Sequence, residues 1–479
     1  MQQTVNLNQS LLSAFGTLET NELTPILQGD FTYGINKQLW NYSYVFTITS
    51  PSVAPTNGAL YTNNNGTFVC DYTSGTTFVA FGSSDPSTTG TLTKVSGTGD
   101  ATLTFSAFTT QAGIINNTGA TIDTSVGRLR IQSGTNSAGY AFITAKKIVR
   151  YRAGMGTVAR FTPVYTAGVA SNVQYFGIGT ISNNALYDGF YIGYNGTAFG
   201  IAYYNSGTLN WTPRTDASIS SWNGDKCDGT GPSGFNWDPT KGTPVMIKYP
   251  FLGFGDIFFY VQNSITGSWI LFHTIKYANT VAVPELSNPS LQFIGFTLNS
   301  GNTTNQSMYV ASIGMFVSGS RNFISNPKWA IDSNKATITT ETNLVTIRNC
   351  NTYNGVPNKG MIRLNSISFG TGNNSVATLR IKSNATLGGT PSYTPINGTT
   401  ADNGVTITSG NSITSYDTAG TTVNGGNYLF NMSVGNTGAI NIDLTPYDIL
   451  LAPGEIATVS ASATASSTIG CSVNWSEDI

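Results

Sequence analysis

Aromatic and apolar residues of this 479-residue chain gather in short runs that alternate with pairs of turn-forming residues. The densest series lies between residues 146 and 204. Its runs are rich in aromatic and β-branched side chains, and no 3.6-residue period competes with them. The pattern predicts consecutive antiparallel strands that form a meander in one face of a β-sandwich. The predicted strands are Val158–Pro163, Gln174–Gly179, Phe190–Tyr194 and Phe199–Tyr204, and the predicted turns are Asn183-Asn184, Asp188-Gly189 and Asn195-Gly196.

A similar pattern extends toward the N-terminus. Residues 1–50 are expected to supply an anchoring segment and the first strands of the central sandwich. From Trp40 to Thr49, aromatic and aliphatic residues alternate with other residues, which predicts a half-buried strand. Residues 51–110 then change to short strands with tight turns. We predict a small β domain there, a sandwich or a barrel, inserted into the first domain or standing as a module of its own.

The largest unit is predicted at residues 111–317, with about ten to twelve strands in roughly two hundred residues. That size is typical of a lectin-like sandwich of the concanavalin or laminin-G type. Residues 318–334 are expected to form a linker, and residues 335–479 a C-terminal β-sandwich. The predicted fold class is therefore all-β, with tandem β-sandwich or jelly-roll domains.

Composition supports this assignment and narrows the partners. Charged residues make up only 9% of the chain, against roughly 25% in ordinary globular proteins, while 53 glycines and abundant Asn, Ser and Thr disfavour helices. The hydrophobic content of 39% is too high for a disordered chain. The net charge is −1, and no apolar run approaches about 20 residues. We therefore expect neither nucleic-acid binding nor membrane insertion.

Charge is nevertheless distributed unevenly. Residues 126–160, the basic segment, contain seven basic residues and no acidic one, whereas the chain after Lys382 has no Lys or Arg. One interpretation is that the basic segment docks on an acidic surface of a neighbouring subunit; the other is clustering of charges on solvated strand faces. The basic residues are Arg128, Arg130, Lys146, Lys147, Arg150, Arg152 and Arg160, and the late carboxylates are Asp402, Asp417, Asp443, Asp448, Glu455, Glu477 and Asp478.

Cysteine usage and short motifs give no sign of a metal or a cofactor. The four cysteines lie far apart without a Cys-X-X-Cys pair, so we expect no zinc site and four buried free thiols. The first residues lack the basic and apolar regions of a signal peptide, which leads us to expect folding in a reducing cytosol. Residues 154–159 approach a dinucleotide fingerprint but have no βαβ pattern around them, so no cofactor is expected. The cysteines are Cys70, Cys227, Cys350 and Cys471.

Candidate chemistry concentrates in one irregular loop, residues 211–241, which combines three tryptophans with four aspartates. Carbohydrate sites combine aromatic platforms with carboxylates, and glycosidases need a carboxylate pair. The alternative is a loop packed by its own tryptophans, because Trp is mostly buried. The only histidine, His273, lies in a strand-like run, so we predict no catalytic residue, no metal ligand and no enzyme. The predicted glycan surface is Trp211, Trp222, Asp225, Asp228 and Trp237; the other aspartates are Asp216 and Asp238.

Four stretches of the chain resemble virion structural proteins of tailed bacteriophages and large DNA viruses. They are residues 13–36, 128–179, 222–242 and the C-terminal 453–479, and the resemblance covers most of the chain outside 51–110. None of the matching residues is a catalytic signature. The resemblance implies a structural or fibre-like role, often as a homotrimer.

These observations together lead us to expect a non-enzymatic virion component, assembled in the host cytoplasm. Its expected role is an exposed fibre or decoration protein of the capsid or tail that attaches to the host through glycan contact. The expected partners are further copies of the chain in a homotrimer, other virion proteins and host surface glycans. Two alternatives remain open at this point: a virion-associated glycan hydrolase and a bacterial surface adhesin.

Overall fold

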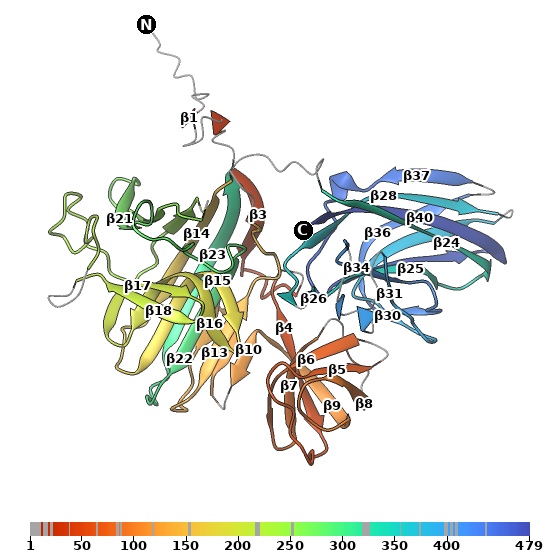
Figure 1. The fold of residues 1–479 in the computed structure, drawn as a ribbon, viewed down its shortest axis with the longest axis horizontal. Coiled ribbons are helices and arrows are strands. Elements are labelled where there is room, and N and C mark those ends of the chain that lie inside the picture. Colours follow the sequence, from red (N-terminus) through yellow and green to blue (C-terminus); the bar gives the residue numbers. More distant parts are fainter. Residues whose placement is uncertain are drawn as a thin grey trace, which may run out of the picture. The chain divides into compact units, whose positions relative to one another are not determined.

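The computed structural model confirms an all-β chain. Within the part of the chain that it describes, the one helical element is a 3-10 turn, η1 (Thr445–Tyr447), and no helix is long and apolar enough to cross a membrane. Two compact units are present, residues 1–42 with 111–321 and residues 43–110 with 322–479 (Figure 1). The structure describes residues 11–12, 18–19, 23–37, 39–63, 66–82, 86, 89–116, 119–151, 155–215, 221–250, 253–318, 326–354, 356–372, 375–396, 401–402, 406–407, 411–435 and 438–479.

The first unit contains a sandwich of two antiparallel sheets. One has seven strands in the order β10-β13-β22-β15-β16-β17-β18. Its strands β15 to β18 form a meander in which each pairs with the next along the chain. The bounds are β10 (Ile114–Asn116), β13 (Tyr140–Thr144), β15 (Asn172–Ser182), β16 (Ala185–Asn195), β17 (Ala198–Asn205), β18 (Thr208–Pro213) and β22 (Gln292–Asn299).

The other sheet has eight strands, in the order β11-β12-β23-β14-β19-β20-β21, with β3 as a third partner of the long β23. The predicted strand Val158–Pro163 lies in β14 of this sheet, so its inclusion in the meander was wrong. It pairs with β19 and β23, both distant in sequence. The bounds are β3 (Leu23–Asp30), β11 (Thr121–Ser125), β12 (Arg128–Gln132), β14 (Thr157–Tyr165), β19 (Val245–Tyr249), β20 (Ile257–Gln262), β21 (Trp269–Ile275) and β23 (Ser307–Ser318).

Two of the three predicted turns are present. Asn183 and Asn184 join β15 to β16 with φ of 49° and 61°, the left-handed region that Asn tolerates better than most residues. Gly196, with φ of 62°, begins the turn from β16 to β17. Asp188-Gly189 instead lies inside β16, which corrects the third prediction. The Asp188 carboxylate is buried and accepts hydrogen bonds from the Ser206 N–H (2.9 Å) and the Ser287 hydroxyl (2.6 Å), so it ties neighbouring segments to the strand.

The core of this sandwich is aromatic. Trp40 is fully buried and its ring packs edge-on against Phe293, which in turn stacks on Phe176. The Tyr165 hydroxyl of β14 donates to the Ile192 carbonyl of β16 (2.6 Å), which joins the two sheets through the core. Each such large buried side chain contributes roughly 1.5–3 kcal/mol, so the packing of these rings determines how the sheets face each other.

Residues 42–112 form a closed barrel in the order β4-β7-β6-β5-β8-β9. Phe46 is fully buried at its centre, with the rings of Phe68, Phe78 and Phe105 between 5.0 and 5.6 Å from its own. The bounds are β4 (Tyr42–Ile48), β5 (Leu60–Asn63), β6 (Gly66–Ser74), β7 (Thr77–Gly82), β8 (Gly90–Ser96) and β9 (Thr102–Ala112).

The barrel corrects the expectation for the strand from Trp40 to Thr49. The sequence analysis assigned it to the central sandwich, but β4 pairs with β7 because its alternating aromatic residues pack into the barrel core. Before β4 and after β9 the chain runs side by side, since the Gly113 N–H donates to the Asn41 carbonyl (2.9 Å). The chain therefore leaves the first sandwich for the barrel and returns to that sandwich at one point.

Residues 328–478 form a second sandwich around the buried Trp475. One sheet has the order β24-β40-β28-β37 with β38 also on β28, and the other has the order β31-β34-β25-β39-β29-β36. The bounds are β24 (Lys328–Ile338), β25 (Thr342–Asn349), β28 (Met361–Thr371), β29 (Ala377–Ser383), β31 (Thr394–Pro395), β34 (Thr414–Asp417), β36 (Asn427–Val434), β37 (Ala439–Asp443), β38 (Leu450–Leu451), β39 (Ile456–Ala463) and β40 (Ser467–Asp478).

The predicted linker, residues 318–334, is shorter than expected. Its second half belongs to β24, which pairs with β40 from Lys328 onward. Trp329 and Ile331 pack against the core of the second sandwich, so alternate residues there have a strand-like environment that a linker would not provide. Residues 319–325 lie outside the described part of the chain.

The four cysteines are buried and free. Burial raises the thiol pKa values, to about 11 for Cys70 and Cys350, so the sulfurs pack as apolar atoms.

The remaining strands are two residues long. Two of their sheets are pairs, β1 (Leu11–Leu12) with β2 (Leu18–Glu19) and β30 (Thr386–Leu387) with β35 (Val423–Asn424). The third sheet contains β26 (Thr352–Tyr353), β27 (Val356–Pro357), β32 (Ala401–Asp402) and β33 (Thr406–Ile407).

Candidate functional site

The loop chosen from the sequence as a glycan surface is packed mainly by its own tryptophans. Trp222 and Trp237 are each only 2% exposed, and their rings lie against Phe272 and Phe199 of the sandwich core. Neither indole can present a face to a sugar, which corrects that part of the prediction. Trp211 is half-buried on β18, apart from this cluster, with its ring 6.1 Å from that of Tyr175.

The aspartates of the loop serve its own backbone. Asp225 accepts hydrogen bonds from the N–H groups of Cys227 and Ser233, both at 2.8 Å; its burial raises the pKa, but these bonds outweigh it, so the pKa is lowered overall. Asp228 accepts from the hydroxyl (2.6 Å) and N–H (2.9 Å) of Thr230, which also lowers its pKa. The structure places these carboxylates as turn-forming groups. Asp216 lies outside the described residues.

Arg214 organises this loop and was not predicted from the sequence. Its guanidinium donates to the carbonyls of Lys226 (2.8 Å), Trp237 (2.9 Å) and Cys227. A fork of fixed donors thus holds both limbs of the loop against the end of β18. A single arginine between Pro213 and Thr215 carries no sequence pattern that distinguishes this role.

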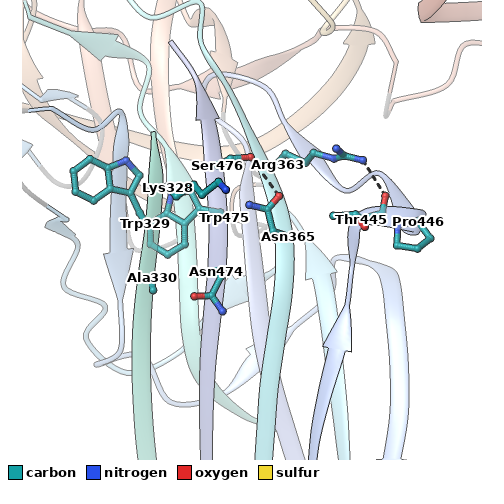
Figure 2. Close-up of a pocket in the computed structure, with 10 residues that line it drawn as sticks. All are labelled: Lys328, Trp329, Ala330, Arg363, Asn365, Thr445, Pro446, Asn474, Trp475 and Ser476. Carbon is teal, nitrogen blue, oxygen red and sulfur yellow. Dashed lines mark hydrogen bonds between the residues drawn. The ribbon is translucent and has the colours of Figure 1, made fainter. Parts of the chain in front are cut away.

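A groove on the second sandwich is more open than the tryptophan loop. It lies on the outward face of the sheet formed by β24, β40 and β28, with η1 as one wall, and its volume is about 880 Å³ (Figure 2). Strand register places Ala330 opposite Asn474, and both Lys328 and Arg363 opposite Ser476. The groove is lined by Lys328, Trp329, Ala330, Arg363, Asn365, Thr445, Pro446, Asn474, Trp475 and Ser476.

A β-bulge directs one of the groove's amides. The register of β28 with β40 shifts between Leu364 and Ser366, so Asn365 is the additional residue. Bulges commonly re-aim a side chain out of the regular alternation. Here the Asn365 side chain meets the Ser476 hydroxyl, which donates to its Oδ1 at 3.3 Å.

Hydrogen bonding inside the groove leaves two amide atoms available. Asn474 donates through Nδ2 to the Ser366 hydroxyl (3.0 Å), and Arg363 donates to the Thr445 carbonyl (3.0 Å) and lies 3.4 Å from the Asp448 carboxylate. The Asn365 Nδ2 and the Asn474 Oδ1 have no partner among the described residues. The groove therefore offers a hydrogen-bond donor and an acceptor from neighbouring strands, a pattern that matches hydroxyl groups.

The sequence contained a weak signal for this surface. Its last strand was predicted, and Ser472, Asn474 and Ser476 alternate there with apolar residues, which indicates a polar outward face. The groove itself was missed because its walls come from residues up to about 150 positions apart in the sequence, a separation that local periodicity does not reveal.

The structural likenesses of this chain to known proteins are distant. No protein-family model and no curated protein matches the chain. Among solved structures, the Lotus tetragonolobus seed lectin is 11% identical, with 44% of this chain and 94% of the lectin covered, at a TM-score of 0.26. The potassium-bound carbohydrate recognition domain of Emp46p is 9% identical, with 41% and 86% covered at 0.26, and the alginate lyase AlyC3 is 9% identical, with 42% and 80% covered at 0.25.

The class of protein that the strands and sheets define is an all-β chain with two β-sandwiches and a barrel. What the Lotus lectin, Emp46p or the lyase bind or cleave does not transfer to this chain at such identities. The residues of the groove and of the sheet faces must carry any functional argument.

Proposed function

We propose that this chain is a non-enzymatic structural protein of a virus particle, an exposed fibre or decoration component of the capsid or tail. We further propose that the groove on its second sandwich contacts glycans of the host surface. One observation carries the contact role: the amides of Asn365 and Asn474 keep unpartnered polar atoms in an open groove of about 880 Å³.

The chemistry of the groove favours a hydroxylated ligand. Asparagine amides both donate and accept, as sugar hydroxyls do, and an open sheet face can receive a chain of sugar units along its strands. The Arg363 guanidinium is already engaged by Asp448, which leaves Lys328 as the exposed cation of the groove. A neutral or weakly acidic oligosaccharide is therefore the ligand that the groove suits.

The structural role rests on the family resemblance and on the modular fold. Two sandwiches and a barrel, each around its own hydrophobic core, suit a chain that projects from a particle. Assembly in the host cytoplasm, a homotrimeric state and contacts with other virion proteins belong to the same proposal. Its uncharged surfaces suit packing between like subunits that depends little on salt.

A glycan array probed with the full-length chain tests the contact role. The wild type should bind a defined set of glycans, and the double change Asn365→Ala and Asn474→Ala should weaken that binding by about tenfold or more, since each lost hydrogen bond contributes about 1 kcal/mol. Asn334→Ala, an exposed asparagine on β24 outside the groove, is the matched control and should bind as the wild type does. Binding that survives the double change, or no glycan binding at all, would contradict the groove's role.

A further inference from the structure

Three cations lie over aromatic rings on the outward face of the eight-stranded sheet in the first unit. Arg128 lies 4.5 Å from the ring centre of Tyr309, and Lys248 lies 5.4 Å from that of Tyr260. Arg160 lies between two rings, 5.9 Å from Trp269 and 5.8 Å from Phe316. None of the three cations has a carboxylate partner among the described residues. The positive charge of these three side chains is therefore not neutralised by an ion pair.

A hollow beside Arg160 has a structural cause. Strand register places Arg160 of β14, Gly314 of β23 and Gln28 of β3 in one row across the sheet. Since neighbouring strands lie about 4.8 Å apart, Arg160 and Gln28 stand about 10 Å apart across the glycine. A Cβ at position 314 would come within 2.7 Å of the Phe316 ring. The absence of a side chain at Gly314 therefore leaves room for that ring and opens the hollow.

The hollow combines charge, aromatic surface and hydroxyl-binding groups. Its volume is about 490 Å³, and its lining includes Arg160, the rings of Trp269 and Phe316, and the polar side chains of Gln28, Thr162 and Ser312. One carboxylate, Asp30, also lines it, and its Oδ1 accepts from the Thr32 N–H at 3.1 Å. The anion-binding capacity is thus restricted to the side of the hollow where Arg160 lies.

We propose that this hollow binds an acidic saccharide, with its carboxylate or sulfate on the Arg160 guanidinium. Arginine binds planar anionic groups with two parallel hydrogen bonds, and its stacking on rings preorganises the guanidinium. Gln28, Thr162 and Ser312 supply groups for the sugar hydroxyls, and the two aromatic rings supply apolar surface for the sugar ring. This site is separate from the Asn365 groove, and the inference does not depend on the function proposed there.

The arrangement favours a saccharide over a nucleic acid. Non-specific nucleic-acid binding depends on neutralising many phosphates, and this face has three uncompensated cations on a chain of net charge −1. A saccharide with a single acidic group next to hydroxyls matches the one arginine of the hollow and its polar neighbours more closely than a nucleic acid does.

Titration calorimetry of the full-length chain with acidic and neutral oligosaccharides of equal length tests this inference. Oligogalacturonate and a neutral galacto-oligosaccharide are suitable probes, with a single-stranded DNA oligonucleotide as a third. The acidic probe should bind at least about tenfold more tightly than the neutral one, and added salt should weaken it. Arg160→Ala should abolish this preference, and Arg160→Lys should restore it only in part because lysine lacks the planar fork.

Two further variants keep the test decisive. Arg130→Gln removes a cation of the same face that is already paired with Asp123 (2.5 Å), and should leave binding unchanged. Gly314→Ser should weaken binding by filling the hollow. Equal binding of acidic and neutral probes, retention of the preference in Arg160→Ala, absence of binding, or tighter binding of the DNA would each overturn the proposal.

Discussion

Glu285 is a buried carboxyl group of the first sandwich. It is fully buried, and neither of its carboxylate oxygens has a hydrogen-bond partner among the described residues. Burial, reinforced by the nearby charge of Asp256, raises its pKa to about 8. Its backbone is held independently, because the Tyr203 hydroxyl donates to the Glu285 carbonyl and also meets the hydroxyl of Tyr277 (2.7 Å). At neutral pH the carboxyl group is therefore mainly protonated.

This protonation makes stability depend on pH. Between the pKa of the unfolded chain, 4.5, and about 8, the folded chain keeps a proton that the unfolded chain has released. The free energy of unfolding of the first unit should therefore fall with rising pH, by about 1.4 kcal/mol per pH unit from this group. Glu285→Gln should remove that slope. Urea unfolding between about pH 5 and pH 9 measures it, with Asp30→Asn as an exposed control that keeps the slope; an unchanged slope in Glu285→Gln would be contrary to this account.

His273 provides a second residue-scale prediction. Its ring is buried on β21, and its Nδ1 accepts from the Asn223 N–H at 3.3 Å. Burial lowers its pKa from 6.5 to about 4, so stability from this group is fully present above 6.5 and is lost as the pH falls toward 4. Because the chain has one histidine, its imidazole carbon signal after selective labelling reports this group alone. The signal should titrate near pH 4, and a midpoint near 6.5 would show that the ring is solvated.

At the residue scale, the sequence predicted the loop but not which of its side chains are buried. Three tryptophans in one irregular stretch favoured a packed core and also allowed a glycan platform, and the choice depends on which strands lie beneath them. Trp222 and Trp237 are buried because Phe199 and Phe272 come from two other strands. No local pattern contains that information, and the same is true of Arg214.

Elements were predicted more successfully than their partners. The runs around Gln174, Phe190 and Phe199 are strands, since aromatic and β-branched residues separated by Asn-rich turns have few other solutions. The strands at Val158 and at Trp40 were also present but were placed in the wrong sheet. Alternation identifies a strand, whereas its sheet is decided by pairing across large sequence distances, such as β14 with β23.

The barrel gives an element-scale prediction. Because the Gly113 N–H and the Asn41 carbonyl are hydrogen-bonded, the barrel's entry and exit are already adjacent in the first sandwich. Replacing residues 43–110 with a short Gly-Ser linker should leave that sandwich folded. Circular dichroism and a cooperative thermal transition measure this. Replacing residues 172–205 with the same linker is the control and should abolish folding, since it removes β15 to β17 from a sheet; an unfolded barrel deletion would contradict the prediction.

At the scale of the whole molecule, low charge and abundant Gly, Asn, Ser and Thr predicted the all-β class. The short strands also followed from the apolar runs and the turns between them. The two candidate sites did not, because the Asn365 groove and the Arg160 hollow each need a bulge or a glycine in a specific register. Such details emerge only once distant strands are paired.

The homotrimeric state is a whole-molecule prediction that follows from the proposed particle role. Sedimentation equilibrium of the full-length chain should give three times the mass of one chain. The result should change little with added salt, because few charges are available to be screened. A monomer at all concentrations would contradict the homotrimeric state.

The proposed role of this chain is that of an exposed component of a virus particle. Negative-stain electron microscopy of purified particles with a gold-labelled antibody against the recombinant chain tests it most directly. We expect gold at regular positions on intact capsids or tails, and no gold when the antibody is first saturated with the recombinant chain. Intact particles that stay unlabelled, while the same antibody detects the chain elsewhere in the culture, would contradict it.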